Sequence, residues 1–252
     1  MQIDGQVAAV FGGASGLGEA SARRLAAGGA KVLVADLDAE RGTAVAGAIG
    51  GAHVVCDVAD AGSVEDAVAA AGELGELRIA VDCAGIATPT KLIRKGRPTP
   101  LEDFAKVLAV NLLGTINVLR CAAAAMAVAE PVADGDRGVC VATASIAAFE
   151  GQVGQVAYAA SKAGVAGLAL PVARELADKA VRVVAIAPGL FDTPLLAGLP
   201  APAREELAGS VPYPARLGDP AEYAALVEHI VVNTMLNGET IRLDGALRMG
   251  RG

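Results

Sequence analysis

The feature that most constrains the fold is a regular alternation of short Val- and Ile-rich segments with longer alanine-rich segments. Short runs of β-branched apolar residues are typical of buried strands, and longer alanine-rich segments are typical of helices. The predicted strands are residues 7–11, 31–35, 53–56, 78–83, 138–143, 181–187 and 240–243. The predicted helices are residues 17–27, 39–49, 63–74, 104–129, 156–178 and 220–232. The pattern predicts a single α/β domain over residues 1–252, a Rossmann-type doubly wound parallel sheet of about seven strands with helices on both faces.

Two segments interrupt this alternation. Residues 88–100 (TPTKLIRKGRPTP) are polar and basic, and they lie between the fourth predicted strand and the next helix. Residues 188–214 are rich in proline and glycine and follow the sixth predicted strand. Long loops inside a compact domain usually cover a binding site. We therefore expect both segments to be binding loops or lids.

Charge and composition narrow the class of protein. The net charge of −7 argues against a nucleic-acid surface. No uninterrupted apolar run approaches the roughly 18 residues that span a bilayer, and no basic segment leads into an apolar one as in a secretory signal. The four cysteines are widely spaced, and the two histidines form no cluster with metal-ligand spacing. These features predict a cytoplasmic protein with free thiols and with no metal site, membrane or nucleic-acid partner.

A glycine-rich turn follows the first predicted strand. Its residues are Gly12-Gly13-Ala14-Ser15-Gly16-Leu17-Gly18, and a helical segment starts at once. Glycines let the backbone turn sharply and approach a pyrophosphate, and the helix N-terminus supplies free N–H groups and a positive dipole end. A tight turn without a ligand is the alternative explanation. The position between the first strand and the first helix favours a dinucleotide site.

An aspartate closes each of the next two strands. Asp36 follows the glycine turn by roughly 20 residues, where a carboxylate accepts hydrogen bonds from the adenosine ribose hydroxyls. The same charge would repel a 2′-phosphate, and no arginine follows directly, so the pattern predicts NAD rather than NADP. A helix-capping role is the alternative, and it suits Asp38 better than Asp36. For Asp57, contact with the adenine and simple helix capping are both open.

Ser145, Tyr158 and Lys162 form a second constellation. Ser145 follows the fifth predicted strand, and Tyr158 and Lys162 lie one helical turn apart, so that they share a face. An ammonium next to a phenol favours the phenolate, which brings Tyr158 into range for general acid–base catalysis. Ser145 would hold the substrate oxygen by a hydrogen bond. A surface Tyr–Lys pair and a capping serine are the alternatives, and the combination with the glycine turn favours catalysis.

Together these motifs resemble the short-chain dehydrogenase/reductase family over essentially the whole chain. The family pattern T-G-x-x-x-G-x-G maps to residues 11–18, N-N-A-G to residues 82–85, the catalytic Asn to Asn111 and the Pro-Gly pair to Pro188 and Gly189. The resemblance implies a dehydrogenase that interconverts a secondary alcohol and a ketone, commonly as a homotetramer. Its contacts would come from residues 104–129 and 156–178, with the last strand and residues 220–232 as a second contact.

The resemblance also implies roles for individual residues. Lys162 would bind the nicotinamide ribose, Asn111 would hold a water in a proton relay toward Lys162, and Thr193 would bind the nicotinamide carboxamide. The implied cofactor-binding residues are Gly12, Ser15, Gly16, Leu17, Gly18, Asp36, Asp57, Val58, Cys83, Ala84, Gly85, Tyr158, Lys162, Pro188, Phe191 and Thr193. The implied catalytic residues are Asn111, Ser145, Tyr158 and Lys162. The implied substrate-binding residues are Ser145, Gln155 and Tyr158.

The chain departs from the family pattern at two positions. Phe11 stands where the glycine turn usually begins with threonine, and Asp82 replaces the first asparagine of N-N-A-G. In the family both usual residues tie the cofactor loop to the fourth strand by hydrogen bonds. We therefore expect a less rigid loop and weaker cofactor binding, with the chemistry unchanged.

Several stretches are similar to one subgroup of this family, whose members oxidise the 3-hydroxyl of acyl-CoA chains and often accept hydroxysteroids. These stretches are residues 85–87, 91–96, 101–104, 148–155 and 187–194. Four cations of the first loop could bind CoA phosphates, and a solvated basic loop is the alternative. They are Lys91, Arg94, Lys95 and Arg97. The second loop would supply an apolar lid for an acyl chain or steroid rings, made of Leu190, Phe191, Leu195 and Leu196.

The main prediction is an NAD-dependent oxidoreductase that converts a 3-hydroxyacyl-CoA to a 3-oxoacyl-CoA. A hydroxysteroid dehydrogenase or another small secondary-alcohol dehydrogenase remains open within the enzyme class. A non-catalytic dinucleotide-binding regulator is the alternative from another class. Such a regulator would be expected to have lost Ser145, Tyr158 or Lys162, and all three are present.

Overall fold

Seven parallel strands form one continuous sheet in the structure, a computed structural model that describes residues 1–197 and 200–250. The strands are β1 (Val7–Phe11), β2 (Lys31–Asp36), β3 (Ala52–Val55), β4 (Leu77–Asp82), β7 (Gly138–Thr143), β8 (Val181–Pro188) and β9 (Thr240–Leu243). Their order is β3-β2-β1-β4-β7-β8-β9, so the chain winds outward from β1 in one direction and from β4 in the other. The doubly wound sheet is confirmed, and each strand boundary lies within one residue of its predicted place.

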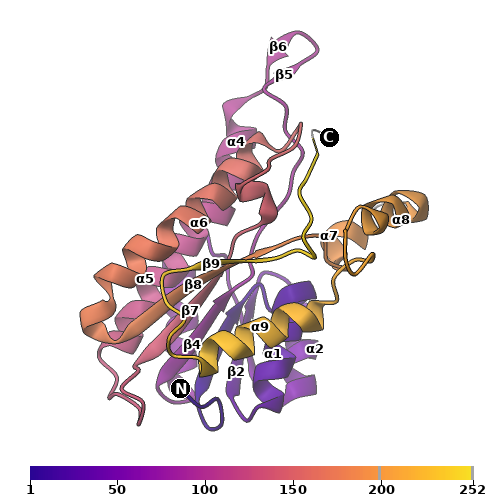
Figure 1. The fold of residues 1–252 in the computed structure, drawn as a ribbon. Coiled ribbons are helices and arrows are strands. Elements are labelled where there is room, and N and C mark those ends of the chain that lie inside the picture. The colour runs from indigo at the N-terminus through magenta and orange to yellow at the C-terminus, as the bar shows by residue number, and fades with distance from the viewer. Residues whose placement is uncertain (198–199, 251–252) are drawn as a thin grey trace.

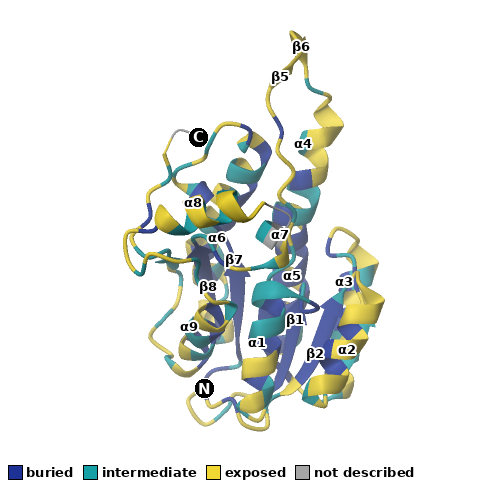
Figure 2. Ribbon diagram, turned by 90° about the vertical axis from the view of Figure 1, so that its right-hand side faces the viewer, coloured by how far each residue is buried: buried dark blue, intermediate teal, exposed yellow. Residues whose placement is uncertain are grey.

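Helices cover both faces of the sheet (Figure 1). One face carries α1 (Gly16–Ala27), α2 (Ala39–Ile49) and α9 (Pro220–Val232), and the other carries α3 (Ala61–Glu73), α5 (Gly114–Ala127) and α6 (Val156–Glu175). Because both faces are covered, the strands are apolar on both sides rather than on alternate residues. In Figure 2 the central strands are buried and the outer surfaces of the helices are exposed.

The segment predicted as one helix over residues 104–129 is less regular than expected. It consists of α4 (Leu101–Leu108), a π-helical turn η1 (Ala109–Leu113) and α5. Single π-helical turns occur frequently at functional sites, and Asn111 lies at the centre of this one. The helix predicted over residues 156–178 ends earlier, at Glu175, and a 3₁₀ turn η3 (Ala177–Lys179) follows.

Both segments predicted as loops contain regular structure. In the first, β5 (Ile93–Arg94) and β6 (Arg97–Pro98) pair as an antiparallel hairpin that stands apart from the body (Figure 1). Lys95 and Gly96 both have positive φ, as a type I′ turn requires, and glycine at its second position is favoured. The second contains α7 (Pro194–Ala197) and α8 (Ala201–Gly209). The sequence pattern predicts binding loops or lids here and does not predict these short elements.

Two helical stretches, Leu101–Ala127 and Val156–Glu175, are long and apolar enough to cross a membrane by length and composition. This corrects the expectation that no segment approaches that length, which considered only uninterrupted apolar runs. Half of the first stretch's apolar window and a third of the second's are buried. α5 packs on β4 and β7, and α6 packs on β8, as core helices of an α/β domain do.

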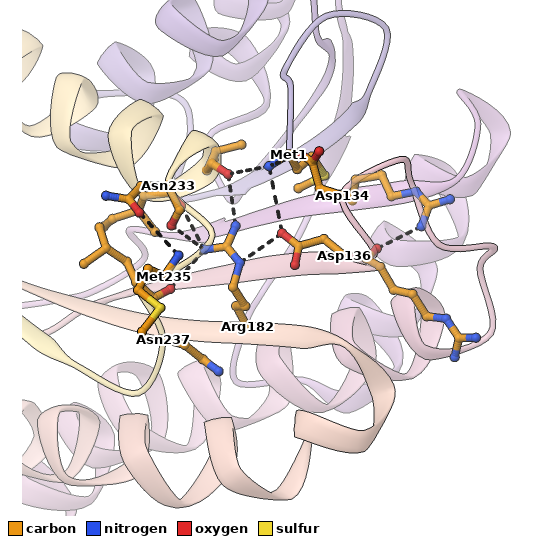
Figure 3. Close-up of polar contacts among 12 residues, drawn as sticks. Met1, Asp134, Asp136, Arg182, Asn233, Met235 and Asn237 are labelled. Carbon is orange, nitrogen blue, oxygen red and sulfur yellow. Dashed lines mark hydrogen bonds and ion pairs between the residues drawn. The ribbon is translucent and has the colours of Figure 1, made fainter.

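Arg182, near the start of β8, connects the sheet to the C-terminal end of α9 by hydrogen bonds (Figure 3). Its buried guanidinium donates to the Asp136 carboxylate at 3.0 Å and to the backbone oxygens of Ile230 and Val231 at 2.9 and 3.0 Å. It also donates to the oxygens of Asn233 and Leu236, just beyond the helix. A buried charge needs such partners. Here they include two carbonyls of the last turn of α9, which have no acceptor role within the helix.

Candidate active site

The polar crevice of a doubly wound sheet opens where neighbouring strands wind in opposite directions, and here these strands are β1 and β4. Gly12 follows β1 with φ +71°, and a Cβ on it would lie 2.6 Å from the backbone nitrogen of Ala84, which follows β4. A Cβ on Gly18 would lie 2.0 Å from the oxygen of Gly12. No side chain fits at either position, because both contacts are to backbone atoms. The glycine turn therefore brings main chain against main chain at the switch point.

The first helix and Asp36 complete a cradle for a dinucleotide. Ser15 is the N-cap residue of α1, yet its side chain makes no capping hydrogen bond to that helix. The Asp36 carboxylate accepts hydrogen bonds from the backbone N–H groups of Ala14 (2.9 Å) and Asp38 (3.0 Å). It therefore holds the glycine turn to the end of β2 while its remaining lone pairs stay available. Asp38 caps α2 by accepting from Arg41, as expected. These residues fit a dinucleotide whose pyrophosphate lies at the N-terminus of α1 and whose adenosine ribose lies at Asp36.

Asp57 and Val58 follow β3 at the same end of the sheet. The Asp57 carboxylate accepts from the Ala59 N–H at 2.9 Å, while the N-cap of α3 is Asp60. The helix-capping alternative for Asp57 is therefore wrong. Val58 packs against Gly114 at the start of α5, where a Cβ would lie 2.7 Å from the valine side chain.

A cavity of about 420 Å³ opens beside the glycine turn. The predicted site residues in its wall are Leu17, Cys83, Gly85, Ser145, Gln155, Tyr158, Lys162, Pro188, Phe191 and Thr193. The predicted residues outside its wall are Gly12, Ser15, Gly16, Gly18, Asp36, Asp57, Val58, Ala84 and Asn111. Apart from Asn111, these belong to the glycine turn and to the ends of β2, β3 and β4. They thus extend the crevice away from the reacting groups.

Tyr158 and Lys162 project from the first half of α6 toward this cavity. The Lys162 ammonium lies 5.9 Å from the centre of the Tyr158 ring and donates to the backbone oxygen of Thr143 at 2.7 Å. Ser145 begins the 3₁₀ turn η2 (Ile146–Ala148), and its hydroxyl accepts from the Ala147 N–H at 3.1 Å. Because that bond uses a lone pair, the hydroxyl hydrogen remains free to be donated into the cavity. Ser145 therefore caps η2, as the alternative predicted, and its hydroxyl also lies where a substrate-binding hydroxyl is expected.

Asn111 lies one layer behind the cavity wall. Its side-chain oxygen accepts from the Ile86 N–H at 2.8 Å, and its side-chain nitrogen donates to the Ile86 oxygen at 2.9 Å and to the Ser161 hydroxyl at 3.1 Å. The amide is thus engaged at both ends. It joins the cavity wall at Ile86 to Ser161 in the first half of α6. A water held by Asn111 would have to bind its backbone carbonyl, which lies in the π-helical turn.

The lid segment is placed over the same cavity. Leu190, Phe191 and Leu196 line it, whereas the side chain of Leu195 lies outside the part of the chain that is described. Thr193 is close to the glycine turn, since a Cβ on Gly16 would lie 3.3 Å from the Thr193 methyl.

Sequence reasoning missed Met249, which also lines the cavity. The segment that carries it is held by Arg242, which donates to the Glu150 carboxylate and to the Leu247 oxygen. A single methionine between Arg248 and Gly250 gives no pattern that could have revealed this.

The two departures from the family pattern keep much of the expected connection. Phe11 is fully buried, and its backbone oxygen accepts from the Cys83 N–H at 2.8 Å. Asp82 accepts from the Ala84 N–H at 3.1 Å and contacts the Thr115 hydroxyl at 2.6 Å. The backbone bond from Cys83 to Phe11 joins β4 to β1, whereas the two side-chain bonds of Asp82 stay at the end of β4 and on α5. The expected loss of a side-chain tie between Asp82 and the glycine turn therefore stays a prediction.

Comparison with known proteins agrees with this geometry. A family model described as short chain dehydrogenase matches residues 6–203. The 3-hydroxyacyl-CoA dehydrogenase type-2 of Homo sapiens is 52% identical over 252 residues, which are 98% of this chain and 97% of that protein. The Drosophila melanogaster protein of the same name is 51% identical over 253 residues, with 98% and 99% covered. A solved 3-hydroxyacyl-CoA dehydrogenase type-2 from Mycobacterium avium matches with a TM-score of 0.95 and 44% identity, covering 98% of both chains. The chain therefore belongs to the short-chain dehydrogenase family and is an oxidoreductase acting on CH–OH groups.

Proposed function

We propose that this enzyme oxidises the 3-hydroxyl of a 3-hydroxyacyl-CoA with NAD⁺, giving the 3-oxoacyl-CoA, NADH and a proton. The observation that carries the proposal is the meeting of Tyr158, Lys162 and Ser145 at one cavity beside the glycine turn. The dinucleotide, when bound, accepts the hydride from the carbinol carbon. The remaining task is to position the alcohol and remove its proton, and these side chains suit that task.

Tyr158 would accept the proton of the substrate hydroxyl. The Lys162 ammonium beside its ring favours the phenolate that this step needs. The Ser145 hydroxyl donates a hydrogen bond to the same substrate oxygen and holds it near the phenol. Lys162 is itself held by the Thr143 oxygen and Ser145 by the Ala147 N–H, so two of the three groups start from fixed positions.

NAD is proposed as the cofactor because of the charge at Asp36. Its carboxylate is fixed by two backbone N–H groups at the end of β2. A 2′-phosphate placed there would meet a fixed negative charge, whereas ribose hydroxyls would find acceptors.

The acyl-CoA substrate is supported by two features of the cavity. Its far wall is apolar, with Ile86, Leu190 and Leu196, and suits an acyl chain. The wall at Thr88 and Pro89 leads directly into Lys91 and the hairpin β5–β6, which together carry four cations. The hairpin base is fixed to the other side of the cavity, because the Thr90 N–H donates to the Gly154 oxygen at 2.7 Å. The names of the relatives given above support the same substrate class.

We also propose a homotetramer formed through α4, α5 and α6. Besides Leu101 at the start of α4, four large apolar side chains remain exposed on α5, α6 and the turn η1, and such patches mark contact surfaces. They are Leu113, Ile116, Val156 and Leu170. Small residues on α5 and α6 could let helices of two subunits approach closely. Of these, Ala124, Ala163 and Gly167 are exposed, whereas Ala122 and Ala123 are buried within the chain. Light scattering at micromolar concentration tests the assembly, and a monomer would reject it.

The experiment for the activity compares steady-state oxidation of 3-hydroxybutyryl-CoA, longer 3-hydroxyacyl-CoAs and a hydroxysteroid with NAD. We expect a higher kcat/KM for an acyl-CoA than for the steroid. A higher kcat/KM for the steroid would mean that a hydroxysteroid, and not an acyl-CoA, is the substrate. Tyr158→Phe should lower kcat by about 100-fold to 10,000-fold, the usual contribution of a general acid–base. The matched control is Tyr213→Phe, since Tyr213 is 82% exposed. Retention of a third of the wild-type kcat in Tyr158→Phe would remove Tyr158 from this role.

A further inference from the structure

Asp82 is a carboxyl group enclosed within the protein, at the end of β4. It is 2% exposed, and it lies between the switch point of the sheet and α5. One carboxyl oxygen accepts from the Ala84 N–H at 3.1 Å, and the other lies 2.6 Å from the Thr115 hydroxyl. A buried carboxylate without a cation in direct contact is costly, and such groups commonly bind a proton instead.

The hydrogen bonds of Thr115 give an independent indication of that proton. The Thr115 hydroxyl lies 2.6 Å from the Asp82 carboxyl and 2.9 Å from the Asn111 backbone oxygen. A hydroxyl has one hydrogen, and an ionised carboxylate and a carbonyl are both pure acceptors. With Asp82 ionised, one of these two contacts would have no hydrogen in it. With Asp82 protonated, Asp82 donates to Thr115 and Thr115 donates to Asn111, so that each contact has its own hydrogen.

The groups that face Asp82 do not supply a compensating charge in direct contact. From α9 the Tyr223 hydroxyl approaches, and burial raises its pKa well above the usual value. Burial also raises the pKa values of the Cys83 and Cys56 thiols to about 11, so these groups are neutral near pH 7. From α6, Lys162 favours ionisation of Asp82, but its ammonium is bonded to the Thr143 oxygen. The burial of Asp82 outweighs the effects of Thr115, Lys162 and Ala84, and its pKa is raised above 3.8.

We propose that Asp82 is held as a neutral carboxylic acid near neutral pH and acts as a positioning residue for the reacting groups. A protonated carboxyl has one acceptor oxygen and one donor, so it reproduces the bonding of the asparagine that the family pattern places here. Through Thr115 it orients the carbonyl of Asn111. Its own backbone oxygen accepts from the Thr143 hydroxyl, and Thr143 in turn holds Lys162. Because Asp82 is neutral, the charge of Lys162 remains available to the Tyr158 phenol.

The charge state is tested first by stability, which does not depend on the proposed function. The folded protein would keep a proton on Asp82 that the unfolded chain releases above pH 3.8. The contribution of Asp82 to stability is therefore fully present below that pH and is lost as the pH rises toward the raised pKa. Relative to Asp82→Asn, the wild-type folding constant should fall by about tenfold per pH unit from that point up to the raised pKa. Urea unfolding at matched protein concentration between pH 4 and 8 measures this. The control is Asp66→Asn, on the exposed face of α3. The ratio of the wild-type folding constant to that of this control should stay constant between pH 4 and 8.

Either of two results would overturn the neutral acid. One is a ratio of the wild-type folding constant to that of Asp82→Asn that stays constant with pH. The other comes from infrared spectra of the wild type, which need no variant and are expected to show a protonated-carboxyl band near pH 7. Absence of that band would mean that Asp82 is ionised. If Asp82→Asn does not fold, the infrared measurement alone decides.

The positioning role rests on the proposed function and is tested by turnover. Asp82→Leu keeps the branching at Cγ but removes both side-chain bonds, and should lower kcat on the order of 10-fold to 100-fold through misplaced groups. Asp82→Asn should rescue that loss and leave the midpoint of the kcat pH profile in place. A midpoint displaced to lower pH in Asp82→Asn would show that a negative charge had been removed, and would refute the proposal. Failure of all substrates with the wild type would refute the proposed function and leave the stability result standing.

Discussion

Arg182→Met should destabilise the protein strongly while leaving the chemistry of each folded molecule intact. The variant keeps most of the side-chain volume but removes every hydrogen bond from Arg182 to Asp136 and to the backbone oxygens at the end of α9. Removing one partner of a buried ion pair typically costs about 3–5 kcal/mol, because the other partner stays buried and uncompensated. Summing hydrogen bonds to a charged group at about 1.5–3 kcal/mol each would exceed this value, and the methionine recovers part of the loss by packing.

The expected loss is a large fraction of the roughly 5–15 kcal/mol that stabilises a domain. For a chain of this size it corresponds to a fall in Tm on the order of 10 °C. Urea unfolding at fixed protein concentration measures the loss, and Arg23→Met is the control, since Arg23 pairs with Glu19 on the surface of α1. Arg182 starts β8, whereas the active site lies at the other end of the strands, so kcat of the folded fraction should be unchanged. A loss below about 1 kcal/mol, typical of exposed pairs, would refute the reasoning.

Three further predictions concern the cofactor, the hairpin and acid stability. Asp36→Ala should lower kcat/KM for NAD by about 10-fold to 150-fold, which is the effect of losing about 1.5–3 kcal/mol of hydrogen bonding to a charged group. It should also narrow the preference for NAD over NADP. A preference of the wild type for NADP would contradict this prediction. The double variant Lys91→Ala with Lys95→Ala should raise KM for an acyl-CoA by about 2-fold to 30-fold, less at high salt, and leave KM for a steroid unchanged. Equal losses on both substrates would assign the hairpin a structural role. The hydrogen bond from Arg216 lowers the pKa of Glu222 from 4.5 to about 2, so this pair stabilises the protein above pH 4.5 and loses its effect as the pH falls toward 2. Glu222→Gln should therefore flatten the loss of stability over that range, and parallel unfolding curves for variant and wild type would refute it.

The strands of the seven-stranded sheet could be predicted to within one residue because each stands out as an apolar run, and its inner strands β1, β4, β7 and β8 are buried on both faces. The catalytic groups could be placed because Tyr158 and Lys162 lie one helical turn apart, a local relation that the sequence shows directly. Features that depend on contacts between distant segments could not be predicted. The π-helical turn at Asn111 depends on its bonds to Ile86, and Met249 reaches the cavity only because Arg242 holds that segment. The hairpin was missed because each of its strands has only two residues.

The backbone contact at Gly12 and Ala84 separates what can vary in this enzyme from what cannot. Because a Cβ on Gly12 would lie 2.6 Å from main-chain nitrogen, the width of the crevice at the cofactor end is set by the backbone and cannot be adjusted by exchanging side chains. The opposite end of the cavity is walled by side chains of the lid and of the chain's last segment. Substitutions there can reshape the space for the substrate without moving the dinucleotide. Selection of variants with new substrate preferences should therefore accumulate changes around Leu190, Leu196 and Met249 and leave Gly12 untouched.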